Sequence, residues 1–293
     1  MATILDLIGN TPLVEITRVI APKPGVKVYG KLEGHNPGGS VKDRAAFSMI
    51  KGALDRGELR DGMKLVEATS GNTGIALAMI ASRYAIPITL IMPDNSTQER
   101  IDTMRAFGAE VILTPADKTI EYSRQVAEEM VAKGGYYMLN QFANPDNYGA
   151  HYRGTGPEIW RDTQGAVTHF VSSMGTTGTI MGVSRYLKEQ NPGIQIAGVQ
   201  PAEGANIPGI RRWSPEFLPK IYEPGRVDRI IDVTKEEASA MARRLAREES
   251  IFGGMSSGGA VTAAARLAGE LAEGVIVCII CDRGDRYLSS DLF

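Results

Sequence analysis

The sequence is poor in cysteine and histidine. Its 293 residues include two cysteines, Cys278 and Cys281, whose Cys-Ile-Ile-Cys spacing is typical of redox motifs and zinc sites. The pair ends the apolar run 275–281, however, which has the pattern of a buried strand. Because residues three apart on a strand point to opposite faces, we expect neither a disulfide nor a shared metal ion. The three histidines have no spacing typical of a triad or a metal site, and we assign no catalytic role to His35, His151 or His169.

An excess of charge of one sign and long apolar runs are also missing. With 32 basic and 34 acidic residues the net charge is −2, which indicates no nucleic-acid or membrane partner. No apolar run approaches the ~20 residues of a membrane span, and the first residues lack the pattern of a signal peptide. We therefore expect a soluble cytoplasmic protein that acts on small molecules.

Short β-rich runs alternate with segments of helical length over most of the chain. The expected strands include 64–67, 88–92, 110–113, 168–172 and 196–199, and the expected helices 73–84, 96–107 and 118–133. This order is typical of α/β proteins whose mostly parallel sheets are covered by helices. Such sheets bind ligands at the carboxyl ends of their strands, where loops lead into helices.

Two irregular stretches interrupt this alternation. Residues 140–147 are rich in turn formers and lie near mid-chain, so we take them as the approximate boundary between two domains. Residues 201–227 contain five prolines and several glycines with little periodicity. A loop of this length in a compact domain is often functional.

Residues 38–46 predict the start of a helix with a lysine, Lys42, in its first turn and Ser40 as a candidate N-cap. The positive end of the helix dipole disfavours an ammonium group at that place. Together with burial, this field would lower the pKa of Lys42 towards the range in which an amine is nucleophilic. On its own, the segment is more typical of an ordinary surface lysine.

Two further segments run from an expected strand through a polar loop into a helix. In residues 67–76, the backbone amides and the hydroxyls of Thr69, Ser70 and Thr73 exceed what helix capping requires, so we favour a site for a carboxylate. Residues 172–180 resemble a phosphate cradle, because glycines allow close approach and the helix dipole stabilises an anion. This second loop matches neither a Walker A motif nor G-x-G-x-x-G, so a nucleotide has weak support.

Together these segments resemble the fold-type II pyridoxal-phosphate (PLP) enzymes, most closely the cysteine synthases (O-acetylserine sulfhydrylases). The resemblance covers essentially the whole chain and runs in order through residues 9–13, 31–33, 38–46, 69–73, 141, 175–179, 256–259 and 286–288. It implies two three-layer α/β domains like those of the tryptophan synthase β subunit. We expect a smaller substrate-loop domain of residues 1–12 plus 35–145 and a larger phosphate-binding domain of residues 13–34 plus 146–293.

The resemblance also implies roles for individual residues. Lys42 would carry PLP as a Schiff base and remove the substrate Cα proton, and Asn72 would bind the ring hydroxyl. Ser256 would lie in the cofactor pocket, and Cys281 would face the pyridine nitrogen, although the adjacent Asp282 is an alternative that would strengthen the electron sink. The phosphate loop would consist of Gly175, Thr176, Thr177, Gly178 and Thr179. The substrate carboxylate would be bound by Thr69, Ser70, Thr73 and Gln141.

The implied activity is β-replacement, in which O-acetyl-L-serine loses acetate to form an aminoacrylate and sulfide then completes L-cysteine. Residues 208–213 and 281–287 look like the type B isozyme, which also accepts thiosulfate and yields S-sulfocysteine. Arg211 and Arg212 are candidates for attracting this dianion. We expect a homodimer. Alternatives are cystathionine β-synthase, threonine dehydratase or the tryptophan synthase β subunit, a non-catalytic PLP-binding scaffold, and a nucleotide-binding α/β protein.

Overall fold

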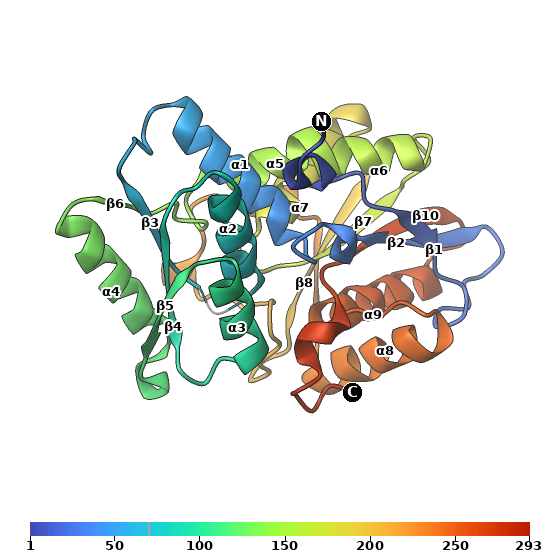
Figure 1. Cartoon of the computed structure of the whole chain (residues 1–293). Coiled ribbons are helices and arrows are strands. Elements are labelled where there is room, and N and C mark those ends of the chain that lie inside the picture. Colours follow the sequence, from blue (N-terminus) through green and yellow to red (C-terminus); the bar gives the residue numbers. More distant parts are fainter. Residues whose placement is uncertain (70) are drawn as a thin grey trace.

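The computed structural model describes residues 1–69 and 71–293, which form two mostly parallel sheets with helices on their faces (Figure 1). The smaller sheet has the order β5-β4-β3-β6, and all its neighbours are parallel. Its strands are β3 (Lys64–Ala68), β4 (Ile88–Pro93), β5 (Glu110–Thr114) and β6 (Tyr136–Tyr137). On one face lie α1 (Lys42–Asp55), α2 (Asn72–Arg83) and α3 (Gln98–Ala106), and on the other α4 (Thr119–Ala132).

The larger sheet has the order β1-β2-β10-β7-β8-β9, and within it β1 is antiparallel to β2. Its strands are β1 (Leu13–Glu15), β2 (Val26–Leu32), β7 (His169–Ser173), β8 (Gln195–Pro201), β9 (Arg229–Val233) and β10 (Gly274–Ile280). One face packs on α8 (Lys235–Glu248) and α9 (Met255–Glu270), and the other on α6 (Gly156–Asp162) and α7 (Gly178–Gln190).

Shorter elements connect these layers. Helix α5 (Pro145–Ala150) packs between α1 and α7 and leads through the π-helical turn η4 (His151–Thr155) into α6. The 3₁₀ turns are η1 (Ile4–Leu7), η2 (Glu33–His35), η3 (Ala116–Lys118), η5 (Pro215–Phe217), η6 (Pro224–Arg226) and η7 (Gly284–Tyr287).

The strands and helices expected from the sequence are confirmed, with ends shifted by one or two residues.

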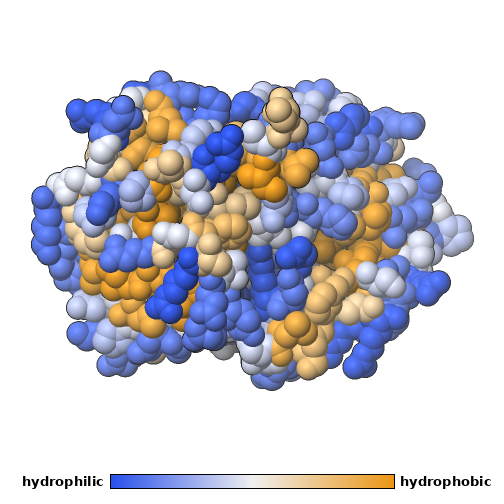
Figure 2. Space-filling view, in the orientation of Figure 1, coloured by the Kyte–Doolittle hydropathy of each residue, from blue (hydrophilic) through white to orange (hydrophobic). Residues whose placement is uncertain are grey.

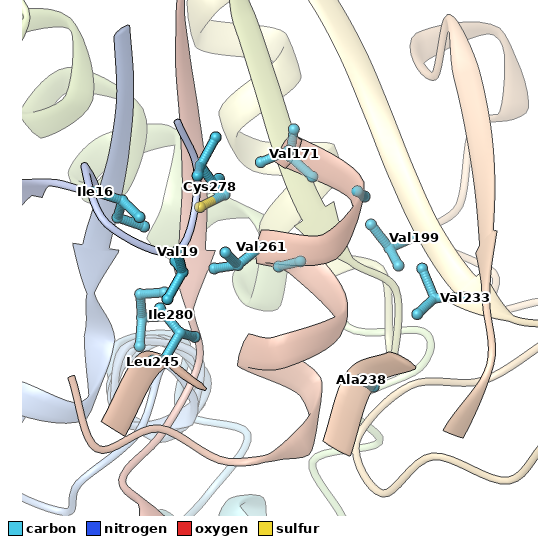
Figure 3. Packing of buried hydrophobic residues seen from close by; sticks show 14 of the residues in the cluster. Ile16, Val19, Val171, Val199, Val233, Ala238, Leu245, Val261, Cys278 and Ile280 are labelled. Atoms are coloured by element: carbon cyan, nitrogen blue, oxygen red, sulfur yellow. The ribbon is translucent and has the colours of Figure 1, made fainter. Parts of the chain in front are cut away.

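The continuous apolar run of strand β10 is explained by its position between two cores. Ile276, Cys278 and Ile280 pack in the core with α8 and α9, where Figure 3 shows Cys278 and Ile280. Val277 and Ile279 pack in the core beneath α7. Both faces of the strand are therefore buried, and alternate residues enter different cores. Cys278 and Cys281 pack in these two opposite cores, as expected from their spacing, and both are free thiols.

The turn-rich stretch 140–147 follows β6, the last strand of the smaller sheet, and leads into α5. The division of the chain into two domains at the expected boundaries stays a prediction. Among the described residues, no helix is both long and apolar enough to cross a membrane.

Candidate active site

A cavity of about 690 Å³ opens where the carboxyl ends of β3, β7, β8 and β10 meet the loop that precedes α1. This is the place where parallel sheets commonly bind ligands. The predicted site residues that line it are Lys42, Thr69, Asn72, Thr73, Gln141, Gly175, Thr176, Thr179, Arg211, Arg212, Ser256 and Cys281. Thr177 and Gly178 belong to the same loop as Gly175 but are not part of the cavity wall. Ser70 lies outside the described residues.

Lys42 is the first residue of α1, and its side chain is partly accessible from the cavity. The N-cap residue is Val41, not Ser40, but the Ser40 hydroxyl accepts a hydrogen bond of 3.2 Å from the Lys42 backbone N–H. Desolvation lowers the pKa of the Lys42 amine, while electrostatic interaction with Cys281 and Asp282 acts in the opposite direction. A lysine with a lowered pKa in a cavity is suited to nucleophilic and proton-transfer chemistry.

The carboxylate loop is built from two chain segments. Thr69 follows β3, Thr73 lies in the first turn of α2, and Gln141 comes from the turn-rich stretch after β6. All three are buried, and the Thr73 hydroxyl donates a hydrogen bond of 2.9 Å to Gln141 Oε1. Because α2 begins after Gly71 without a side-chain cap, the first N–H groups of the helix are available to an anion.

The phosphate loop has a backbone that few residues other than glycine adopt. Thr177 has a positive φ of 69°, and its buried Oγ1 has no hydrogen-bond partner among the described residues. A Cβ on Gly178 would lie 2.0 Å from Asn147 Oδ1, so this position requires glycine. A buried, unpaired hydroxyl at the start of α7 calls for an acceptor or an anion, and the residues present therefore fit the phosphate of PLP.

Asn147 joins the two loops and was not singled out from the sequence. Its Nδ2 donates to the Gln141 carbonyl at 2.7 Å and to Thr176 Oγ1 at 3.1 Å. Next to it, the buried ring of His151 lies 3.3 Å from Thr179 Oγ1 through Nε2. Burial and the charge of Arg44 lower the pKa of His151 to about 3, so the ring is neutral at ordinary pH.

Cys281 and Asp282 are adjacent but face different surroundings. Cys281 lines the cavity with Ser256, and burial together with the Asp282 charge raises the pKa of the Cys281 thiol to about 12. The Asp282 carboxylate is not part of the cavity wall and accepts hydrogen bonds from Asn72 Nδ2 (2.7 Å), Tyr287 Oη (2.6 Å) and the Gly254 N–H (3.2 Å). The group nearest the cavity is thus a neutral thiol.

The mouth of the cavity carries a chain of aromatic and cationic side chains. Arg211 lies over the Trp213 ring at 5.3 Å, and Trp213 meets the edge of Phe142 at 5.6 Å. On the other side, Arg124 of α4 lies over Phe142 at 5.5 Å. Arg212 is held instead by an ion pair with Asp232 and by the Pro201 carbonyl.

A buried ion cluster anchors α1 two residues beyond Lys42. The Arg44 guanidinium makes paired hydrogen bonds with both carboxylate oxygens of Glu33 and of Glu158, at 2.7 to 2.9 Å. Lys31, whose side chain is fully buried, adds an ion pair of 2.9 Å to Glu158. The sequence did not predict that these four charged residues form a cluster, because they come from four different elements.

A lysine at a helix start and a helix N-terminus suited to an anion line one cavity at the strand ends of two α/β sheets, an arrangement typical of PLP-dependent enzymes. Residues 4–282 match the family described as pyridoxal-phosphate dependent enzymes. Cysteine synthase B of Pseudomonas aeruginosa is 59% identical over 291 residues, which cover 99% of this chain and 97% of that protein. Cysteine synthase B of Escherichia coli is 55% identical over 293 residues, covering 100% and 96%.

Solved structures agree with these relatives. The crystal structure of cysteine synthase from Entamoeba histolytica superposes with a TM-score of 0.95 at 40% identity, covering 100% of this chain and 90% of that one. The chain belongs to the PLP-dependent enzymes and, within them, to the cysteine synthases. The predicted family, fold class and cofactor are confirmed, and the nucleotide-binding alternative does not fit this membership.

Proposed function

We propose that this protein makes L-cysteine from O-acetyl-L-serine and sulfide by β-replacement, with PLP attached to Lys42. The observation that carries the proposal is the Lys42 amine, whose pKa is lowered by desolvation, in one cavity with a carboxylate loop and a phosphate loop. The sequence identity to cysteine synthases over the full chain supports the same activity.

PLP supplies delocalisation of the electron pair left at the substrate Cα. The protein supplies position: the start of α7 and Thr177 hold the phosphate, and Thr69, Thr73 and Gln141 hold the substrate carboxylate. Lys42 Nζ accepts the Cα proton, which a neutral amine can do and an ammonium cannot. The neutral Cys281 thiol of the cavity wall would be the group offered to the ring nitrogen, and a partner without a carboxylate charge would favour elimination of acetate over transamination.

The test is a two-stage spectroscopic assay on the purified protein. We expect a visible absorption band that changes when O-acetylserine is added and returns when sulfide is supplied, with cysteine as the product. Serine with homocysteine tests for cystathionine β-synthase activity, threonine alone for threonine dehydratase activity, and serine with indole for tryptophan synthase activity. We expect none of these reactions to be as fast as that of O-acetylserine with sulfide. A protein that binds PLP but leaves O-acetylserine unchanged would instead support the non-catalytic scaffold.

We also propose that thiosulfate serves as a second sulfur donor, giving S-sulfocysteine. The support is the cationic mouth of the cavity, where the Arg211 guanidinium is stacked on Trp213 and carries no ion pair among the described residues. Arg212 is a weaker candidate, since Asp232 already neutralises it.

We predict that Arg211→Gln raises the KM for thiosulfate about tenfold, since a charge-assisted contact is lost, and leaves the KM for sulfide nearly unchanged. Arg212→Gln should have the smaller effect of the two. Steady-state kinetics with each donor measures this difference. Equal losses with sulfide and thiosulfate would show that Arg211 supports the loop and does not select the donor.

A homodimer, a cytoplasmic location and the two domains described above remain proposals. Exposed apolar side chains support the dimer: Ile4 and Leu7 of η1 are 42% and 60% exposed, and apolar surface gathers near this segment (Figure 2). Light scattering should give twice the protomer mass of 31.6 kDa. We predict that Ile4→Ser/Leu7→Ser shifts the protein towards the monomer, whereas Ile230→Ser, at an exposed apolar residue of β9, does not.

A further inference from the structure

The Arg286 side chain joins the two segments that carry Lys42 and Asn72. It lies in η7, after the last strand of the larger sheet, and is 8% exposed. Its Nη1 donates to Asn72 Oδ1 at 2.5 Å, and its Nη2 donates to the Gly38 carbonyl. One rigid guanidinium therefore spans from the turn before α1 to the first residue of α2.

The contacts of the Asn72 amide allow one orientation. Arg286 can only donate hydrogen bonds and an ionised Asp282 can only accept them, so Asn72 Oδ1 must face Arg286 and Nδ2 must face Asp282. Asp282 is held in turn by Tyr287 Oη at 2.6 Å. After these bonds, one N–H of Asn72 Nδ2 is still available, and Asn72 lines the cavity.

The same segment is bonded to the backbone before Lys42. The Val41 N–H donates to the Cys281 carbonyl at 2.8 Å, and the Arg283 N–H donates to the Gly39 carbonyl at 3.3 Å. A Cβ on Gly39 would lie 2.6 Å from Arg286 Nη2, so the glycine makes room for the guanidinium. Gly39 thus leaves space for the guanidinium, and Gly38 supplies the carbonyl that accepts its hydrogen bond.

We propose that Arg286 is a positioning residue that fixes the amide of Asn72 and the turn before Lys42 relative to each other. Through Asn72 it determines which hydrogen-bonding group faces the ring hydroxyl of PLP. This inference rests on the proposed role of Asn72. It assigns no contact with the substrate to Arg286, which does not line the cavity.

The test compares Arg286→Gln and Arg286→Lys with Arg283→Gln, a change at an exposed arginine of the same segment. Each apoprotein is titrated with PLP, and the dissociation constant and the visible band of the bound cofactor are recorded. We expect both Arg286 variants to raise the dissociation constant about tenfold and to shift the band, because neither side chain has the two separate nitrogens of a planar fork with which Arg286 bonds Asn72 and Gly38. Arg283→Gln should match the wild type.

A double-mutant cycle with Asn72→Ala tests whether Arg286 acts through Asn72. We expect the effects on the dissociation constant to be non-additive, so that Arg286→Lys adds less than about twofold once Asn72 is replaced. Fully additive effects, or wild-type titrations of both Arg286 variants, would overturn the inference. Circular dichroism checks folding, and Arg286→Lys carries the test if Arg286→Gln does not fold. A wild type that makes cysteine while the Arg286 variants bind PLP normally would refute this inference and leave the proposed function standing.

Discussion

Replacing Lys42 by alanine is expected to lower the rate of cysteine formation by at least about 1,000-fold and to abolish the visible band of the wild type. The variant loses both the amine that holds the cofactor and the group proposed to accept the substrate Cα proton. No other lysine of the described chain lines the cavity. The two readouts are the single-turnover rate with O-acetylserine and sulfide and the absorption spectrum at saturating PLP.

Lys51→Ala is the matched control for this experiment. Lys51 lies in the same helix, is exposed and is paired with Asp55 one turn later. An exposed pair of this kind contributes little to stability, so the control should keep the wild-type spectrum and rate. A Lys42→Ala protein with more than a tenth of the wild-type rate would remove Lys42 from its proposed role.

Arg44→Gln is expected to lower the free energy of unfolding by about 3–5 kcal/mol, because it leaves two buried carboxylates without their main partner. Glu33 is fully buried and Glu158 is 6% exposed, and Arg44 bonds both in a paired geometry. Urea denaturation with an unchanged m-value measures the loss. Arg56→Gln is the control, since Arg56 is exposed and its loss should cost less than about 1 kcal/mol.

The ion cluster also predicts how stability changes with pH. Although burial opposes ionisation, the bonds to Arg44 and Lys31 lower the pKa of Glu158 to about 2, and Arg44 and Thr11 lower the pKa of Glu33. Both carboxylates therefore stabilise the native state above their usual pKa near 4.5, and this contribution is lost as the pH falls through their lowered pKa values, which for Glu158 is about 2. Between pH 5 and pH 3 the wild type should lose more stability than Arg44→Gln. Parallel losses would show that the cluster does not hold these pKa values down.

The local parts of the site could be predicted from the sequence because each is written in consecutive residues. Lys42 at the start of α1 and Thr177 before α7 belong to strand–loop–helix or turn–helix segments, and the carboxyl ends of parallel strands meet at one edge. Thr69 and Thr73 followed from the same rule. The alternation of apolar runs and helices was sufficient for the fold class, since continuous apolar strands require helices on both faces.

Contacts between distant segments could not be predicted in this way. Asn147 bonds Thr176 across 29 positions, Arg44 bonds Glu158 across 114, and Arg286 bonds Asn72 across 214. Periodicity indicates which face of an element is buried but not which other element covers it. Residues 281–287 were noted for their likeness to the type B isozyme, but nothing local indicates that Arg286 reaches α2.

The sequence left open how the two residues of each of two adjacent pairs differ, and their neighbours in space decide this. Cys281 and Asp282 are neighbours, and only the packing of the last strand against Ser256 and Asn72 places the thiol on the cavity wall and the carboxylate behind it. Arg211 and Arg212 look alike in sequence, but Arg212 forms an ion pair with Asp232, whereas Arg211 lies over the Trp213 ring. The sequence by itself determined the α/β fold and predicted the lysine and the two polar loops that line the cavity, because helix starts and strand ends are local. The tertiary structure decided which charges are paired and which face the cavity, because electrostatic partners are chosen by distance in space.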